Sequence, residues 1–147
     1  MSGRVAQDVG GPGSGPAAGV GVIGIDHVQL LMPIRGEPAA RRFYGDLLGL
    51  REVEKPAALA ERGGCWFVGP GGTAIHLGVD QRFIPARRAH VCLIVADLSV
   101  AREALAGAGE GVVEDDAMLG IARCYATDPF GNRIELVDAS DAGFTAP

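Results

Sequence analysis

All three histidines of this chain fall at matched positions of an internal repeat, together with one glutamate. His27 begins the segment His-Val-Gln-Leu, and His90 begins the similar His-Val-Cys-Leu at an offset of 63 (90 − 27). His76 lies in Gly-Thr-Ala-Ile-His-Leu, which returns as Gly-Asn-Arg-Ile-Glu-Leu with Glu135 at an offset of 59 (135 − 76). Imidazoles and carboxylates are ligands of divalent transition metals. The repeat therefore predicts a metal site formed by His27, His76, His90 and Glu135.

This ligand set does not select one metal, because imidazole and carboxylate suit Zn, Ni, Co, Mn and Fe(II) alike. We expect one divalent ion as cofactor. The three cysteines are odd in number, lie far apart and form no Cys-x-x-Cys pair, which disfavours a thiolate site. Cys65, Cys92 and Cys124 are expected to be free, buried thiols in a reducing cytosol.

The composition excludes several classes of function. A chain of 147 residues, of which 48% are hydrophobic, fits one domain with a substantial core. The net charge of −5 argues against a sequence-independent nucleic-acid surface, which needs clustered Lys and Arg. Residues 1–22 hold neither a signal peptide nor a membrane span but a Gly/Pro-rich run, which predicts a flexible tail. We expect a cytoplasmic protein that acts on a small molecule, without nucleic-acid or membrane partners.

The elements that must position the ligands form two similar modules. In the first module, Glu37-Pro38 is typical of a helix start and Gly49 of a helix end. Alternating or apolar runs predict its strands at 23–32, 50–54, 65–68 and 73–79. In the second module, Asp97 is the predicted N-cap of a helix that ends near Gly107 or Gly109. Its predicted strands are 89–95, 111–114, 121–127 and 133–138.

Each module thus has the order β-α-β-β-β, which predicts an α+β fold with a curved, cleft-bearing mixed sheet. The modules are expected at about 23–79 and 89–138, in one domain at 23–138 followed by a tail at 139–147. Neighbouring residues of a strand point to opposite faces. The residues expected on the face that the helices cover are Val28, Leu30, Ile75, Leu77, Val79, Val91, Leu93, Val95, Ile134 and Leu136. All four candidate ligands leave on the other face, so a duplicated unit is expected to bring them together around a pseudo-twofold axis.

Four segments resemble the vicinal oxygen chelate superfamily, over about residues 23–138. They are His27 at a strand start, Ile-His-Leu-Gly at 75–78, Ala-His-Val at 89–91, and Asp-Pro-Phe-Gly-Asn-Arg-Ile-Glu-Leu at 128–136. The superfamily includes glyoxalase I, methylmalonyl-CoA epimerase, fosfomycin- and bleomycin-resistance proteins, and extradiol dioxygenases. The resemblance implies metal ligands on the first, fourth, fifth and eighth strands, which carry the four candidate ligands here. His76 departs from the glutamate of glyoxalase I and the glutamine of the epimerase, so neither activity follows outright.

The resemblance favours a divalent-metal-dependent lyase or isomerase of glyoxalase type that acts on a small substrate with vicinal oxygens. In this hypothesis the ion stabilises an enediolate or related oxyanion, and Glu135 or His76 serves as the base. One alternative is an Fe(II) extradiol-type dioxygenase, with His76 as acid/base and Tyr125 as the tyrosine on the strand before Glu135. The other is a metal-free binding or resistance protein with an aromatic groove. The resemblance also implies a homodimer, with the site either within one chain or shared between two.

Overall fold

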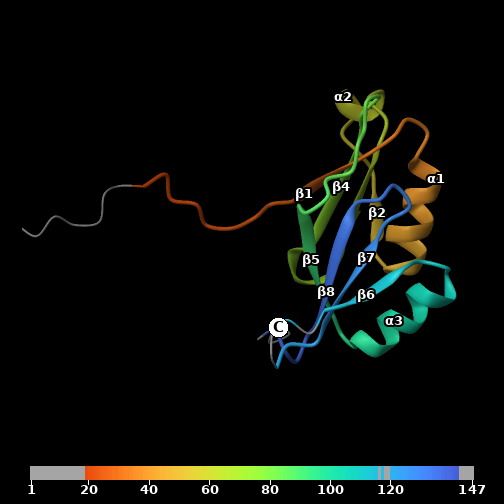
Figure 1. The fold of residues 1–147 in the computed structure, drawn as a ribbon. Coiled ribbons are helices and arrows are strands. Elements are labelled where there is room, and N and C mark those ends of the chain that lie inside the picture. Colours follow the sequence, from red (N-terminus) through yellow and green to blue (C-terminus); the bar gives the residue numbers. More distant parts are fainter. Residues whose placement is uncertain (1–18, 116, 118–119, 143–147) are drawn as a thin grey trace, which may run out of the picture.

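The structure is a computed structural model that describes residues 19–115, 117 and 120–142 (Figure 1). The first module contains β1 (Val28–Met32), α1 (Glu37–Ala40), η1 (Arg41–Leu47), β2 (Arg51–Val53), α2 (Ala57–Ala60), β3 (Cys65–Val68), η2 (Pro70–Gly72) and β4 (Ala74–Val79). The second module contains β5 (His90–Val95), α3 (Leu98–Gly107), β6 (Val112–Glu114), β7 (Arg123–Thr127) and β8 (Arg133–Asp138). Residues 1–18 and 143–147 of the two predicted tails lie outside the described residues. In the part of the chain described, no helix is long and apolar enough to cross a membrane.

The strands form two four-stranded mixed sheets, ordered β1-β4-β3-β2 and β5-β8-β7-β6. In each sheet the first and last strands of the module pair in parallel, and the other neighbours pair antiparallel. The two sheets therefore have the same topology, and the predicted pair of β-α-β-β-β modules is confirmed. Neither sheet closes on itself. In Figure 1 the continuous helical segment of α1 and η1 lies on the same side of the strands as α3, so these helices do not cover the other face of the sheets.

The predicted start of the first strand at residue 23 is wrong. Pairing with β4 begins at Val28, opposite Ile75, and residues 19–27 run as an extended segment away from the sheets (Figure 1). Ile23 and Ile25 are 102% and 82% exposed, so the alternating pattern there has no strand beside it to cover its apolar side chains. His27 consequently lies one residue before β1, although it remains next to the sheet.

The first helix begins at Glu37 as predicted, but its second part has a different hydrogen-bonding pattern. α1 continues directly into η1, a π-helical segment, and the segment ends before Gly49, whose φ is +72°. A positive φ is readily adopted by glycine, which explains why the helix ends here. The short helix α2 in the loop before β3 was not expected from the sequence.

The core lies between the helices and the two sheets. The side chains of Ile75, Leu77, Ile134 and Leu136 are each 1% exposed, which confirms the predicted helix-covered face at the central strands β4 and β8. The largest fully buried side chains include Tyr44 and Phe43 of η1, Phe67 of β3 and Met32 of β1. Full burial of one such side chain contributes roughly 1.5–3 kcal/mol. One continuous hydrophobic cluster includes residues of both modules, so the core joins them.

A buried hydrogen-bond network also joins the modules. The Tyr44 hydroxyl donates to Asp128 Oδ2 at 2.7 Å. The Asn132 side-chain amide donates to that same oxygen and to the Leu31 carbonyl, each at 2.8 Å. Asp128 and Asn132 are 3% and 8% exposed. We call these four residues the Asp128 network; it ties the turn before β8 to the helix η1 and to the end of β1.

Candidate metal centre

The ligand face of the first sheet carries a stack of three rings. The His76 ring stacks on the Trp66 ring of the neighbouring strand, with centroids 4.0 Å apart and planes 4° from parallel. It also stacks on the His27 ring, with centroids 4.0 Å apart and planes at 21°. Trp66 is the cross-strand partner of His76, which explains why their side chains share a face. We call His27, His76 and Trp66 the first half-site.

Hydrogen bonding leaves one nitrogen of His27 free for a metal. Nδ1 lies 2.7 Å from the carboxylate of Asp26, so the proton of the neutral ring belongs on Nδ1 and the lone pair on Nε2. Metal-binding histidines commonly donate their second nitrogen to such an acceptor. Burial, followed by the proximity of His27, lowers the pKa of His76. His76 is therefore neutral near pH 7, which is the form that binds a metal ion.

On the second sheet, the Glu135 carboxylate lies between a histidine and an arginine. Glu135 Oε2 is 2.8 Å from His90 Nε2, and Oε1 is 3.1 Å from Arg123 Nη1. Arg123 in turn donates to Asp115 at 3.0 Å. The Glu135 side chain is 11% exposed and that of His90 is 30% exposed. We call His90 and Glu135 the second half-site.

The contact within the second half-site joins two acceptor atoms when the His90 ring is neutral. His90 Nδ1 lies 2.8 Å from the Arg88 carbonyl, which can only accept, so Nδ1 carries a proton. Nε2 of the neutral ring then presents a lone pair to a carboxylate oxygen, and two acceptors repel each other at 2.8 Å. A proton or a metal ion shared between them removes this repulsion. The donor chemistry of His90 and Glu135 thus fits a divalent ion.

Two further side chains of the ligand face adjoin Glu135. Tyr125 and Cys92 are its cross-strand partners on β7 and β5. The Tyr125 ring meets the His90 ring edge-on, with centroids 5.5 Å apart. Cys92 is exposed, so the prediction that it is buried is wrong, whereas Cys65 and Cys124 are buried as expected and all three are free. The reason is that Cys92 shares the ligand face with His90, on an edge strand of its sheet.

The structure therefore places the four candidate ligands as two pairs, His27 with His76 and His90 with Glu135. Within the described residues of one chain, no three or more His, Cys, Asp or Glu side chains form a group able to hold a metal ion. The pairs lie on corresponding faces of two sheets with the same topology. Convergence of all four ligands on one ion stays a prediction.

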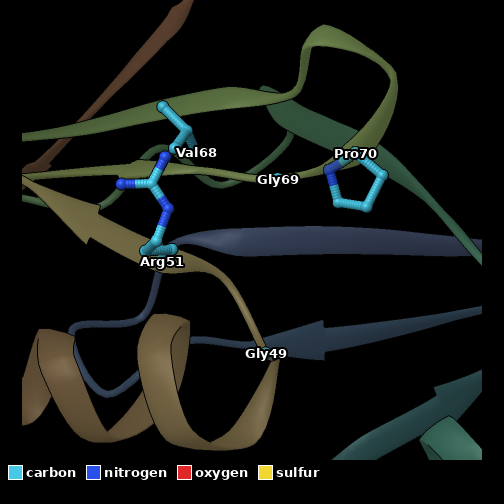
Figure 2. A pocket seen from close by; sticks show the side chains of 5 residues that line it. All are labelled: Gly49, Arg51, Val68, Gly69 and Pro70. Atoms are coloured by element: carbon cyan, nitrogen blue, oxygen red, sulfur yellow. The ribbon is translucent and has the colours of Figure 1, made fainter.

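Figure 2 shows a pocket at the outer edge of the first sheet, lined by Gly49, Arg51, Val68, Gly69 and Pro70. Its volume is about 270 Å³. None of its lining residues is a candidate ligand. This pocket therefore has no part in the predicted metal site.

The ionic partners of Glu135 and the symmetry of the aromatic residues were not predicted from the sequence. Arg123 and Asp115 had no assigned role, and their contact depends on a loop whose path the sequence pattern does not predict. Trp66 and Tyr125, in contrast, were recognisable as a matched pair, because they keep the offset of 59 (125 − 66) found for His76 and Glu135. Each of these rings lies beside the candidate ligand in its own sheet.

The two repeated β-α-β-β-β modules, with their candidate ligands on the face away from the helices, are the features to compare with known protein families. A family model for the glyoxalase-like domain matches residues 32–137. A glyoxalase family protein from Bacillus anthracis is 44% identical, with 80% of this chain and 95% of that chain covered and a TM-score of 0.76. The chain belongs to the glyoxalase-like domain family, within the vicinal oxygen chelate superfamily.

More distant solved structures share the fold. A member of the glyoxalase/bleomycin resistance protein/dioxygenase superfamily from Sphaerobacter thermophilus is 23% identical, with 79% and 98% of the two chains covered and a TM-score of 0.62. Lactoylglutathione lyase from Agrobacterium tumefaciens is 20% identical, with 79% and 95% covered and a TM-score of 0.58. No match was found among curated proteins.

Proposed function

We propose that this protein is a divalent-metal-dependent lyase or isomerase of glyoxalase type that acts on a small substrate with vicinal oxygens. The observation that carries the proposal is the pairing of His90 Nε2 with Glu135 Oε2 at 2.8 Å, which brings an imidazole and a carboxylate suited to a divalent ion together on one face. The family supports the reaction class, since the matched domain is glyoxalase-like and the 44% identical relative is a glyoxalase family protein. The matched pair His27 and His76 would supply the remaining ligands.

Each residue has a distinct task in this proposal. His27, His76, His90 and Glu135 would hold the ion, which when bound supplies an electrophile that polarises adjacent substrate oxygens. Glu135 or His76 removes a proton from the carbon next to a substrate carbonyl. The lowered pKa of His76 keeps its ring neutral, so its lone pair is available at neutral pH. Arg123 keeps the Glu135 carboxylate in one orientation through the 3.1 Å contact.

Metal binding tests the proposal directly. Protein purified without an affinity tag and titrated with Ni, Co, Zn or Mn is expected to bind the ion stoichiometrically. Glu135→Gln is expected to lower the affinity at least about tenfold, because it removes the charged ligand. Glu103→Gln, the same change at an exposed position of α3, is the matched control and leaves the affinity unchanged. Absence of stoichiometric binding by the unmutated protein contradicts the proposal.

A second candidate function is an Fe(II) extradiol-type dioxygenase, favoured by the position of Tyr125. Its ring is edge-on to His90, and its backbone is paired with that of Glu135. This function predicts anaerobic Fe(II) binding and oxygen uptake with catechols, and slower uptake in Tyr125→Phe. If neither occurs while another metal binds well, the dioxygenase is excluded.

A third candidate is metal-free binding of an aromatic ligand, favoured by the stacked rings of the first half-site. A planar ligand would extend that stack. Unchanged ligand affinity after chelation and in His90→Ala would favour this function over both enzymes.

We also propose a homodimer, whose metal site lies either within one chain or between two. In a shared site, the first half-site of one protomer faces the second half-site of its partner. A mixed dimer of His76→Ala and Glu135→Gln chains then contains one intact site and regains metal binding that both parent variants lack. If the site forms within one chain, the mixed dimer binds no better than its parents. The cytoplasmic location also stays a prediction, which fractionation of the producing cells tests.

A further inference from the structure

Arg133 shares the ligand face with the second half-site. It lies two residues before Glu135 on β8, so both side chains leave the same face of the sheet. Its cross-strand partner on β5 is His90. Arg133 has no part in the proposed function. On a face that would also hold a divalent cation, its guanidinium adds positive charge, which a bound anion would offset.

The two arginines beside Tyr125 differ in their partners. Arg123 makes ion pairs with Asp115 and Glu135, and its side chain is 14% exposed. The Arg133 guanidinium instead lies 3.6 Å from the centre of the Tyr125 ring, against 5.8 Å for that of Arg123. Among the described residues no carboxylate oxygen lies within the 4.0 Å ion-pair distance of Arg133. Arg133 therefore has no direct ion-pair partner in this part of the chain, and Asp115, which bonds Arg123, acts on it only at longer range.

Stacking on a ring holds a guanidinium by its face and leaves its edge of N–H donors free. That edge matches the two oxygens of a carboxylate in a bidentate pair. We propose that Arg133 is the specificity residue that binds a carboxylate of the substrate, held for this purpose by Tyr125. The inference rests on the proposed function and narrows its substrate class.

The spacing along β8 limits where that carboxylate sits on the substrate. Two strand positions separate Arg133 from the ligand Glu135 by roughly 7 Å. A substrate whose vicinal oxygens lie near Glu135 therefore carries its carboxylate several bonds from those oxygens. The substrate class is a small acid with a separate pair of adjacent oxygens, such as a dihydroxy or hydroxyketo acid.

A matched pair of probes tests this inference by binding, without turnover. The probes are 3,4-dihydroxybenzoate and its methyl ester. Both present the same vicinal oxygens, but only the acid carries a charged carboxylate. They are titrated into Zn- or Ni-loaded protein, with the single tryptophan, Trp66, as the fluorescence reporter. The unmutated protein is expected to bind the acid at least about tenfold more tightly than the ester, as for a charge-assisted bidentate pair. Arg133→Met is expected to bind both probes equally, with unchanged affinity for the ester.

Two further variants complete the experiment. Arg42→Met, at an exposed position of the helical segment η1, is the matched control and keeps the preference for the acid. Arg133→Lys keeps the charge but lacks the planar fork, so the preference falls severalfold; this variant serves if Arg133→Met does not fold. Equal binding of both probes by the unmutated protein, or a preference that survives in Arg133→Met, overturns the inference and leaves the proposed function intact. Failure of the metal-loaded protein to bind either probe also overturns the inferred substrate class, whereas the proposed function is contradicted only if the metal itself does not bind.

Discussion

At the scale of single residues, His76 couples protonation to folding. Burial and the neighbouring His27 lower its pKa from the ordinary value of 6.5, so the folded chain resists a proton that the unfolded chain accepts. The stability contribution of His76 is therefore full above pH 6.5 and decreases as the pH falls below that value. Urea unfolding of metal-free protein at pH 7.5 and pH 5.5 measures this loss. It is expected to be smaller in His76→Phe, and an equal loss in both proteins contradicts the assignment.

A substitution at Gly64 probes the close approach of the loop before β3 to the strand β4. Its φ is +88°, and a Cβ atom built there lies 2.2 Å from the Leu77 carbonyl oxygen, which belongs to the strand that carries His76. Gly64→Ala is expected to destabilise the fold by at least about 2 kcal/mol, from backbone strain and this overlap together. Gly72→Ala is the matched control, because Gly72 also has a positive φ but nothing within 4 Å of its added Cβ. Its expected cost is about 1 kcal/mol; equal urea midpoints for the two variants would contradict the prediction.

At the scale of elements, two carboxylates satisfy the first N–H groups of α3. Asp97 accepts from Ser99 and Val100 at 2.8 and 3.0 Å, which confirms the predicted N-cap. Asp138, at the end of β8, accepts from the Leu98 amide at 2.9 Å and so connects the helix to the strand that carries Glu135. Asp97→Ala is expected to cost about 1 kcal/mol of stability, measured by urea unfolding at pH 7.

Asp138 makes the stability of this junction depend on pH. Its hydrogen bonds to Ser140 and Leu98 lower its pKa from 3.8, so the folded state favours the carboxylate. The contribution is present above pH 3.8 and is lost as the pH falls through the lowered pKa. Asp138→Asn is expected to be less stable than the unmutated protein at pH 7, with a difference that narrows below pH 3.8. Asp46→Asn, at an exposed position, is the control and shows no such difference.

Element boundaries were predictable where the sequence itself contains the turn. β3 and β8 were correct to the residue, because Gly69-Pro70 ends the one and Gly131-Asn132 precedes the other. The predicted start of β1 was wrong because alternation of apolar and polar residues indicates an extended segment but not whether another strand lies beside it. The π-helical form of η1 was also not predictable, since apolar spacing over two turns hardly separates it from an α-helix.

At the scale of the whole molecule, the repeat predicted each pair of ligands, but not how the pairs meet. Within a sheet, parity and register bring His90 to Glu135, and both follow from the sequence. The distance between the two half-sites depends instead on how one sheet is placed against another, in the same chain or in a partner. That placement is determined by tertiary contacts such as the Asp128 network, whose members lie up to 101 residues apart.

The Asp128 network is expected to stabilise both modules together, because its hydrogen bonds run from η1 and β1 to the turn before β8. Tyr44→Phe removes one donor from a buried carboxylate and is expected to cost about 1.5–3 kcal/mol, the range for a hydrogen bond to a charged group. Burial and Asp128 raise the pKa of Tyr44, so its hydroxyl stays a donor across the accessible pH range. Tyr125→Phe is the matched control, with an expected cost below about 0.5 kcal/mol. Urea unfolding followed by Trp66 fluorescence, which reports on the first module, and by hydrogen exchange of the α3 amides, which reports on the second, is expected to shift to the same lower midpoint in Tyr44→Phe. A shift confined to one signal would mean that this network stabilises one module and does not hold the two half-sites in place.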